Sequence, residues 1–335
     1  MVKYINTICL LFFYVLAYMK GTAINMTIMQ LRYMIAISET GSLSRASEVL
    51  FVSQPSLTSS VKELERELGI SIFNRGGKGM TLTADGAEFI LYARQVCQMF
   101  DNLLDKYANP ETLKKKFGVS AQHYSFAVKA FVEMTRTFDI SEYDFALRET
   151  KTSEVIGDVS SLKSEIGILY LSDFNRKILN KLFAASDIEF HSLIECKAYV
   201  YLWRGHPLAD NKSVTMHELE KYPCLSFDQG ENGSFYLAEE LYSTKEYQRA
   251  VKVSDRATML NLMLGLGGYT ICSGIICEEL NGDDYVAVPL EPEEPELRNK
   301  MDIGYIKKKG MILSRMGELY ISEIKKYLLP YIAKN

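Results

Sequence analysis

The chain has 335 residues, which corresponds to roughly two domains at about 100–200 residues each. Hydrophobic residues make up 47% and charged residues 24%, a globular composition that excludes collagen-like, disulfide-scaffold and wholly disordered chains. The net charge of -4 does not mark the whole chain as a nucleic-acid binder. Residues 26–116 carry 11 Lys and Arg against 10 Asp and Glu, whereas residues 117–335 carry 25 against 32. Only the amino-terminal part could therefore approach a polyanion without strong repulsion.

Residues 1–25 form a hydrophobic extension. Its central residues 8–19 are almost entirely apolar, with a lysine on either side. This run resembles a signal-peptide core and is short for a membrane-spanning helix. It could also be a weakly anchored extension, or result from a start codon assigned too early. Because the next segment has the features of a DNA-reading module, we expect translation to start at Met26, a cytoplasmic protein and no stable membrane association.

The six cysteines are scattered, with no Cys-x-x-Cys pair and no histidine at zinc-finger spacing. We therefore predict no metal site. Scattered cysteines in a chain of this length indicate buried thiols in a reducing compartment. Cys272 and Cys277 could form a redox pair, but one buried strand thiol and one helix thiol is the simpler interpretation.

Residues 41–68 predict two short helices joined by a tight link. Ser42 is a suitable N-cap for the first helix, which places three apolar residues on one face. After a break at residues 51–52, Ser53 can cap a second helix with Pro55 in its first turn. Apolar residues of the second helix, spaced by 4, 3 and 4, define a buried stripe: Leu57, Val61, Leu64 and Leu68.

The outer face of the second helix is predicted to be polar and small. Helical spacing places Ser56, Ser59, Ser60 and Glu63 opposite the stripe, and Gln54 at the exposed amino-terminal end. Two such helices are typical of a helix-turn-helix, whose hydroxyl and amide side chains can approach base edges in the major groove. An ordinary helical hairpin with a solvated outer face is the alternative.

The residues that follow favour DNA binding. Gly69 can end the second helix as a C′ glycine. A short strand, a basic glycine-rich tip and a second strand then predict a small hairpin, or wing, whose two basic residues would reach phosphates. The predicted DNA contacts are Ser53, Gln54, Pro55, Ser56, Thr58, Ser59, Ser60, Lys62, Arg75 and Lys78.

This part of the chain resembles the DNA-binding domain of LysR-type transcriptional regulators, over nearly all of residues 26–90 without a gap. The resemblance rests on Leu31-Arg32-Tyr33, Gly41-Ser42, Ala46, Val52 to Leu57, Leu64-Glu65, Leu68-Gly69, Leu82-Thr83 and Gly86. It implies a winged helix-turn-helix over residues 26–83 and a sequence-specific regulator that binds double-stranded promoter DNA. Members often carry Arg or Lys and then Gln where this chain has Ser59 and Ser60, so the operator cannot be inferred.

Residues 84–108 predict a long linker helix, with Thr83 as its cap. Apolar residues spaced by 4, 3, 4, 3 and 4 predict an a/d seam: Phe89, Ala93, Val96, Phe100, Leu103 and Tyr107. The seam could pack on its own domain, but it matches the linker helix of LysR-type regulators, which implies a homodimer or a tetramer. Residues 109–116, with their lysine run, are predicted to be a solvated hinge.

Residues 117–330 alternate strands with helices, which predicts an α/β domain with a largely parallel sheet. A carboxyl-terminal helix is expected from about Ser314. The expected strands are 142–150, 165–171, 198–203, 225–227, 251–253, 269–273 and 285–289. Residues 203–209 and 265–268 resemble the turns after the crossover into the second lobe, and before the return to the first, in LysR-type effector domains. This implies two lobes, similar to periplasmic binding proteins, and a small-molecule effector.

Ligands of open α/β sheets bind beyond the carboxyl ends of strands. Backbone N–H groups at the helix start near Thr152 could hold a carboxylate or phosphate, which allows for an anionic effector. Structural alternatives exist: a packed or surface position for His123, core positions for Tyr170 and Trp203, and a helix cap for Thr152. The predicted effector-binding residues are Ser120, Gln122, His123, Thr150, Thr152, Tyr170 and Trp203.

Taken together, the sequence predicts a transcriptional regulator controlled by a small-molecule effector. An exported two-lobed solute-binding protein is the alternative, suggested by the hydrophobic amino terminus, but it leaves residues 26–107 unexplained. An α/β enzyme would need a nucleophile elbow, a phosphate loop or a paired-carboxylate motif, and the sequence has none. No catalytic residue and no cofactor is therefore predicted.

Overall fold

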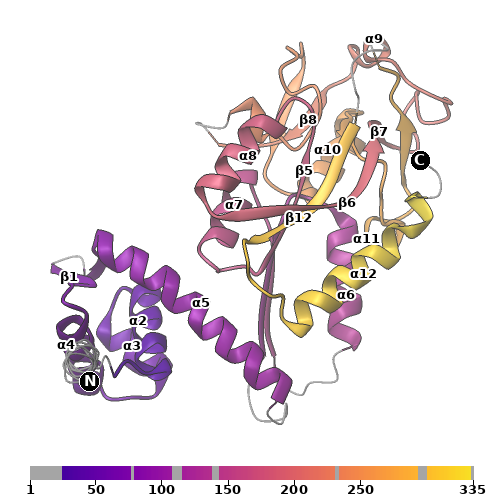
Figure 1. Cartoon of the computed structure of the whole chain (residues 1–335). Helices are drawn as coiled ribbons and strands as arrows, with labels where there is room; N and C mark the ends of the chain where they lie inside the picture. The colour runs from indigo at the N-terminus through magenta and orange to yellow at the C-terminus, as the bar shows by residue number, and fades with distance from the viewer. Residues whose placement is uncertain are drawn as a thin grey trace, which may run out of the picture. The chain divides into compact units, whose positions relative to one another are not determined.

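The computed structural model describes residues 25–76, 79–107, 115–137, 143–230, 234–292 and 300–332. The chain forms two compact units, residues 1–108 and residues 109–335 (Figure 1). The hydrophobic extension lies outside the described residues except for Asn25, and Lys78 also lies outside them. No helix in the described ranges is long and apolar enough to cross a membrane.

Three helices begin the first unit: α2 (Ile28–Thr40), α3 (Leu43–Leu50) and α4 (Gln54–Leu68). The Ser42 side chain accepts the Arg45 N–H at the start of α3. The Ser53 side chain does the same for the Ser56 N–H at the start of α4. Gly69 ends α4 with a left-handed φ of 69°, which favours glycine. The predicted caps of the two helices are thus confirmed.

The core of this unit lies where the apolar faces of the helices meet. It includes Met34, Ile37, Ala46, Leu57, Val61, Leu64 and Ile72. The predicted wing is an antiparallel hairpin of β1 (Phe73–Gly76) and β2 (Gly79–Leu82). The Met80 N–H donates to the Gly41 carbonyl at 2.9 Å, which attaches the hairpin to the end of α2.

A long helix, α5 (Ala84–Tyr107), follows, and Thr83 Oγ1 accepts the Gly86 N–H at its start. The seam predicted for this helix is wrong at Ala93, which is only 2% exposed and packs with Leu31 of α2. Because α2 covers that side of the helix, the exposed apolar stripe lies elsewhere. It consists of Tyr92, Val96, Met99 and Leu103, again spaced by 4, 3 and 4.

A five-stranded sheet forms the first lobe of the second unit, in the order β4-β3-β5-β12-β6. Its strands are β3 (Lys115–Ala121), β4 (Tyr143–Glu149), β5 (Ile166–Leu171), β6 (Ile188–Lys197) and β12 (Lys300–Lys308). β12 is antiparallel to both β5 and β6, so the sheet is mixed rather than largely parallel. Lys115 and Lys116 pair with β4 and belong to β3, which corrects the predicted end of the hinge at residue 116.

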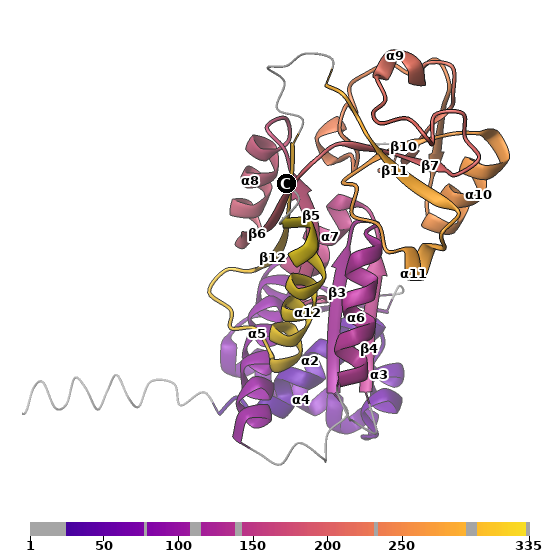
Figure 2. The ribbon, with the colours of Figure 1, turned by 90° about the vertical axis from the view of Figure 1, so that its right-hand side faces the viewer.

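Helices cover both faces of this sheet. They are α6 (Ser125–Thr137), α7 (Thr152–Ser160), α8 (Arg176–Ala185) and α12 (Arg315–Ile332). α6 and α12 lie side by side (Figure 2) and share a core with Val119 and Ile303. α7 and α8 pack on the opposite face around Leu169 and Ile306. Successive strand residues face opposite layers, as the pleat of a strand requires.

The second lobe is smaller and built around the antiparallel sheet β10-β7-β11. Its elements are β7 (Tyr199–Trp203), α9 (Met216–Leu219), β8 (Cys224–Phe227), η2 (Phe235–Leu237), β9 (Ala250–Val253), α10 (Arg256–Leu266), β10 (Thr270–Cys272), α11 (Glu278–Asn281) and β11 (Tyr285–Pro289). The predicted return turn at 265–268 is wrong: Gly267 ends α10 within this lobe. The chain returns to the first lobe only between β11 and β12.

Candidate DNA interface and effector pocket

The outer edge of α4 is exposed above its buried leucines. Exposed residues on this edge are Ser53, Gln54, Pro55, Ser56, Ser59 and Lys62, and Thr58 is half-buried. The Ser53 and Ser56 hydroxyl oxygens lie 2.8 Å apart, and the Thr58 hydroxyl donates to the Gln54 carbonyl at 3.0 Å. These contacts leave a compact polar surface at the amino-terminal end of the helix, where backbone N–H groups also favour anions.

The structure contradicts the predicted outward position of Ser60, which is only 8% exposed. At 3.6 residues per turn, Ser60 lies about 60° from Leu57 around the helix, at the edge of the buried stripe rather than opposite it. Its hydroxyl oxygen finds no hydrogen-bond partner among the described residues. Ser60 is therefore removed from the predicted DNA contacts.

The wing is fastened to α4 by one carboxylate. Glu65 Oε1 accepts the backbone N–H groups of Ile72 and Phe73, at 2.7 and 3.1 Å. The wing residue Arg75 lies in β1, opposite Met80, but its side chain lies outside the described part of the chain.

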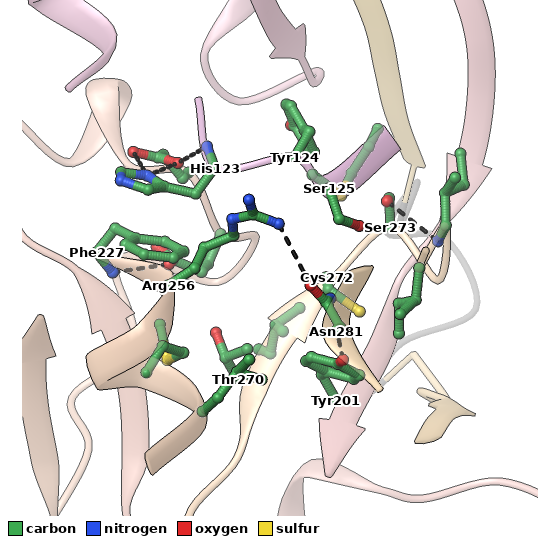
Figure 3. A pocket seen from close by; sticks show the side chains of 18 residues that line it. His123, Tyr124, Ser125, Tyr201, Phe227, Arg256, Thr270, Cys272, Ser273 and Asn281 are labelled. Atoms are coloured by element: carbon green, nitrogen blue, oxygen red, sulfur yellow. Dashed lines mark hydrogen bonds and ion pairs between the residues drawn. The ribbon is translucent and has the colours of Figure 1, made fainter. Parts of the chain in front are cut away.

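A pocket with a cavity volume of about 80 Å³ lies between the lobes of the second unit (Figure 3). A cavity of this size has room for several water molecules or for a very small organic molecule. The first lobe contributes the turn after β3 and the start of α6, and the second lobe contributes β8, α10, β10 and α11. Lining residues with polar side chains are His123, Tyr124, Ser125, Tyr201, Glu239, Glu240, Arg256, Thr270, Ser273 and Asn281.

A buried carboxylate, Glu239, meets three donors at one end of this pocket. The backbone N–H of His123 donates to Glu239 Oε2 at 2.9 Å, and His123 Nδ1 lies 2.9 Å from the same oxygen. Gln229 Nε2 donates to Glu239 Oε1, also at 2.9 Å. The His123 ring stacks on Phe227, with ring centroids 3.8 Å apart. The imidazole is therefore held in place by a neighbour from the opposite lobe.

A second polar chain crosses the pocket. Arg256 Nε lies 2.9 Å from Glu149 Oε1, and its Nη1 donates to Asn281 Oδ1 at 3.4 Å. Asn281 Nδ2 in turn lies 3.3 Å from the Tyr201 hydroxyl, to which it donates (Figure 3). Burial raises the pKa of Glu149, and the Arg256 charge opposes that rise. Burial also raises the pKa of Tyr201 to about 12, so this hydroxyl stays protonated.

Two further groups of the pocket wall are buried. Burial, together with the nearby Glu239 charge, raises the pKa of Glu240 to about 8, while the Phe227 N–H donates to its Oε1 at 2.8 Å. The Thr270 hydroxyl, in a residue only 6% exposed, has no hydrogen-bond partner in the described ranges. Cys272 and Cys277 are free thiols, and burial raises the pKa of Cys272 to about 12.

Of the predicted effector-binding residues, His123 lines the pocket. Gln122 does not line the pocket. Its Nε2 donates to Thr152 Oγ1 at 2.6 Å, and its Oε1 accepts the Tyr170 N–H at 3.1 Å. The Tyr170 hydroxyl donates to the Glu240 carbonyl, and the Thr150 hydroxyl bonds Glu154. Gln122, Thr152 and Tyr170 thus lie next to the pocket wall, and none of these four predicted residues lines the pocket.

Two predicted positions lie away from the pocket. The Ser120 hydroxyl is fully buried against α7, where it donates to Asp158 Oδ2 at 2.6 Å. Trp203 ends β7 and packs its ring against Gly205. The rule that ligands bind beyond strand carboxyl ends applies to parallel sheets, and β7 lies in an antiparallel one. Neither residue lines the pocket.

The structure adds pocket residues that the sequence did not indicate: Phe227, Glu239, Glu240, Arg256 and Asn281. Gln229 does not line the pocket but bonds Glu239, which does. The available signal was the pair Glu239–Glu240 between two apolar neighbours, in a segment without helical or strand periodicity. Two adjacent carboxyl groups in an apolar stretch are a reason to expect burial with shifted pKa values.

Comparisons with known proteins agree with this organisation. The family described as bacterial regulatory helix-turn-helix protein, lysR family, matches residues 28–87, and the LysR substrate binding domain matches residues 141–316. The Escherichia coli (strain K12) protein named uncharacterized HTH-type transcriptional regulator YbhD is 24% identical over 298 residues, which cover 86% of this chain and 87% of that protein.

Solved structures show a similar fold. Full-length OxyR from Pseudomonas aeruginosa, in a variant form, aligns with a TM-score of 0.64 and 18% identity over 90% of this chain and 95% of that one. Full-length CbnR complexed with its target DNA aligns with a TM-score of 0.51 and 20% identity over 90% of this chain and 100% of that one. The domain matches account for both units and give no support to an exported solute-binding protein. The chain belongs to the LysR family of bacterial DNA-binding transcriptional regulators, with an amino-terminal helix-turn-helix and an effector-binding domain.

Proposed function

We propose that α4 reads promoter DNA through the polar edge that begins at Gln54. The observation that supports this most strongly is the division of α4 into a buried stripe and an exposed edge of amide and hydroxyl groups. A glutamine amide can bond adenine with two hydrogen bonds, and small hydroxyls let the helix approach the bases closely. Lys62, Arg75 and Lys78 would contact phosphates, which position the module without reading sequence.

The proposed active form is a homodimer, or a tetramer built from dimers, in the cytoplasm. The exposed stripe on α5 gives each chain an apolar surface at coiled-coil spacing. Pairing two such helices would present two copies of α4 to a pseudo-palindromic site. This assembly would also account for four large apolar side chains on one exposed face of a helix.

The proposed effector site is the pocket between the lobes. Its walls come from both lobes, so a ligand that prefers one lobe arrangement over another would shift the population of that arrangement. Such a shift would change the spacing or angle between two paired DNA-binding units. The polar groups on either side of the pocket give the site means to orient a small polar molecule.

Fluorescence anisotropy of the full chain on DNA from upstream of its own gene tests the central proposal. We expect the logarithm of the binding constant to fall linearly with the logarithm of salt concentration. Lys62→Ala should make that slope shallower by about 1, which is the change expected for one lost phosphate contact. Glu48→Ala, an exposed change on α3, should leave the slope unchanged. Absent or salt-independent binding would overturn the proposal.

A further inference from the structure

The environment of Glu239 has the chemistry of a carboxylate-binding site. Three donors, the His123 backbone N–H, His123 Nδ1 and Gln229 Nε2, converge on its two oxygens at 2.9 Å. The His123 and Glu239 side chains are each only 5% exposed. Because all three groups can present N–H, this arrangement suits an anion and would repel an ammonium group.

Contacts that do not involve Glu239 hold these donors in place. The His123 ring is stacked on Phe227 with an angle of 4° between the rings. Gln229 Oε1 accepts the Thr152 N–H at 3.0 Å, so the amide is oriented by the first turn of α7. The donor cluster is thus preorganised, and it joins a residue of the first lobe to one of the second.

Glu239 itself arrives on a separate segment, Ser234 to Leu241, which follows β8 and contains η2. The Thr152 hydroxyl donates to the Leu237 carbonyl at 2.7 Å, and the Tyr170 hydroxyl donates to the Glu240 carbonyl at 3.2 Å. His123 and Glu239 both line the pocket. A molecule in the pocket can therefore contact His123. Gln229 is not a lining residue, and its contact with a ligand requires that the Glu239 side chain leave its amide.

We propose that Glu239 is an internal occupant of a carboxylate subsite, and that the effector is a small carboxylic acid whose carboxylate replaces the Glu239 side chain on His123 and Gln229. The regulatory part of this inference rests on the proposed function, but the subsite itself does not. The acid's carboxylate would then accept from the same donors, while the displaced Glu239 side chain would turn away from them. The apolar walls formed by Met259, Ile275 and Met301 would then contact the hydrocarbon part of the acid.

The proposed subsite predicts how tightly a free carboxylate binds with and without the Glu239 side chain. A tethered side chain competes at a high effective concentration, so a free carboxylate binds the native chain weakly. Removing the tethered group vacates the donors and should strengthen the binding of a small free carboxylate. Acetate, which reproduces the end of the glutamate side chain, is therefore the appropriate probe.

The test is an acetate titration of full-length Glu239→Ala, followed by thermal unfolding at constant ionic strength. We expect saturable stabilisation with an apparent Kd at least about tenfold lower than in the native chain. Glu246→Ala, which removes an exposed carboxylate, should respond as the native chain does. Methylammonium chloride should give no response in any variant. A folded Glu239→Ala protein without a saturable acetate response would overturn the proposal.

Two further variants cover the cases in which Glu239→Ala does not fold or acetate binds at another site. Glu239→Gln retains the side-chain volume but not the charge, and it should also bind acetate more tightly than the native chain. Gln229→Ala in the Glu239→Ala background should weaken acetate binding at least about threefold, because one donor is lost. An unchanged response would place acetate at another site and contradict the proposal. Since DNA is absent from these titrations, their outcome is independent of promoter binding.

Discussion

The carboxylate of Glu65 accepts the backbone N–H of Ile72 at 2.7 Å and so joins α4 to the strand that begins the wing. The same oxygen accepts the Phe73 N–H. This side chain therefore helps to fix the position of the wing relative to α4. An acceptor shared by two N–H groups is costly to remove, because both donors then lose their partner.

Glu65→Ala is expected to lower the free energy of unfolding of the first unit by about 1–3 kcal/mol. DNA affinity should fall as well, because the wing loses its attachment to α4. Glu65→Gln keeps a carbonyl oxygen in place and should recover most of the loss. Urea unfolding and anisotropy on promoter DNA measure both effects. A Glu65→Ala chain as stable as Glu48→Ala would show that the attachment is unimportant.

Two glycines on helices should respond to alanine in opposite ways. A Cβ on Gly86, in the first turn of α5, would lie 2.0 Å from the Ile72 carbonyl oxygen. Gly86→Ala should therefore lower the free energy of unfolding of the first unit by at least about 1–3 kcal/mol. Gly157 lies inside α7 with no atom within 4 Å of an added Cβ, and Gly157→Ala should stabilise the second unit by about 0.5–1 kcal/mol. Thermal unfolding measures both changes in stability. Unfolding temperatures that shift in the same direction in the two variants would contradict the prediction.

If the exposed stripe on α5 forms the contact between two chains, one charged residue within it should weaken dimer formation. Met99 is 61% exposed at the centre of this stripe. Met99→Glu should shift the chain toward monomers, because a buried unpaired carboxylate is unfavourable in a helix pair. Val49→Glu places the same charge on an exposed apolar position of α3 and should leave the mass unchanged. Sedimentation velocity distinguishes the cases, and a Met99→Glu protein with the native mass would exclude pairing through this stripe.

Glu240 predicts how stability depends on pH. Burial raises its pKa to about 8 in the folded chain, from an ordinary value of 4.5. Between these values the folded state binds more protons than the unfolded state, so stability falls as pH rises and then levels above about 8. The decrease from this group is at most about 1.4 kcal/mol per pH unit. Glu240→Gln, which retains a carbonyl for the Phe227 N–H, should remove this contribution.

Urea unfolding at several pH values between 5 and 9 checks this prediction. The stability of Glu240→Gln relative to the native chain should increase with pH up to about 8 and then level off. Parallel pH profiles for the two proteins would show that Glu240 ionises as it does in the unfolded chain.

Local elements were predictable because their signals lie close together in sequence. Leu57, Val61 and Leu64 are spaced so that one face of α4 must be buried, and Ser53 and Gly69 mark its ends. The expected strands of the second unit are likewise present, from β4 to β11. Strands β3, β6 and β12 were not predicted.

The pocket depends on contacts that sequence spacing does not reveal. Glu239 is 116 residues from His123, and their contact arises only when the two lobes meet. Ser120 and Ala121 are adjacent in β3, yet the pleat directs the Ser120 hydroxyl to Asp158 under α7 and Ala121 to the core beneath α6. Which face of the strand carried function could not be decided without the topology of the sheet.

The most direct test of the account is selection of bound duplexes from a random DNA pool by the native chain and by Gln54→Ala, Ser59→Ala and Ser44→Ala. We expect Gln54→Ala to lose a base preference at one or two positions, worth about 1–3 kcal/mol of discrimination. Ser59→Ala should alter the preference at a neighbouring position, and Ser44→Ala, on α3, should select the native motif. If all four proteins select the same motif with the same affinity, α4 does not read the DNA sequence.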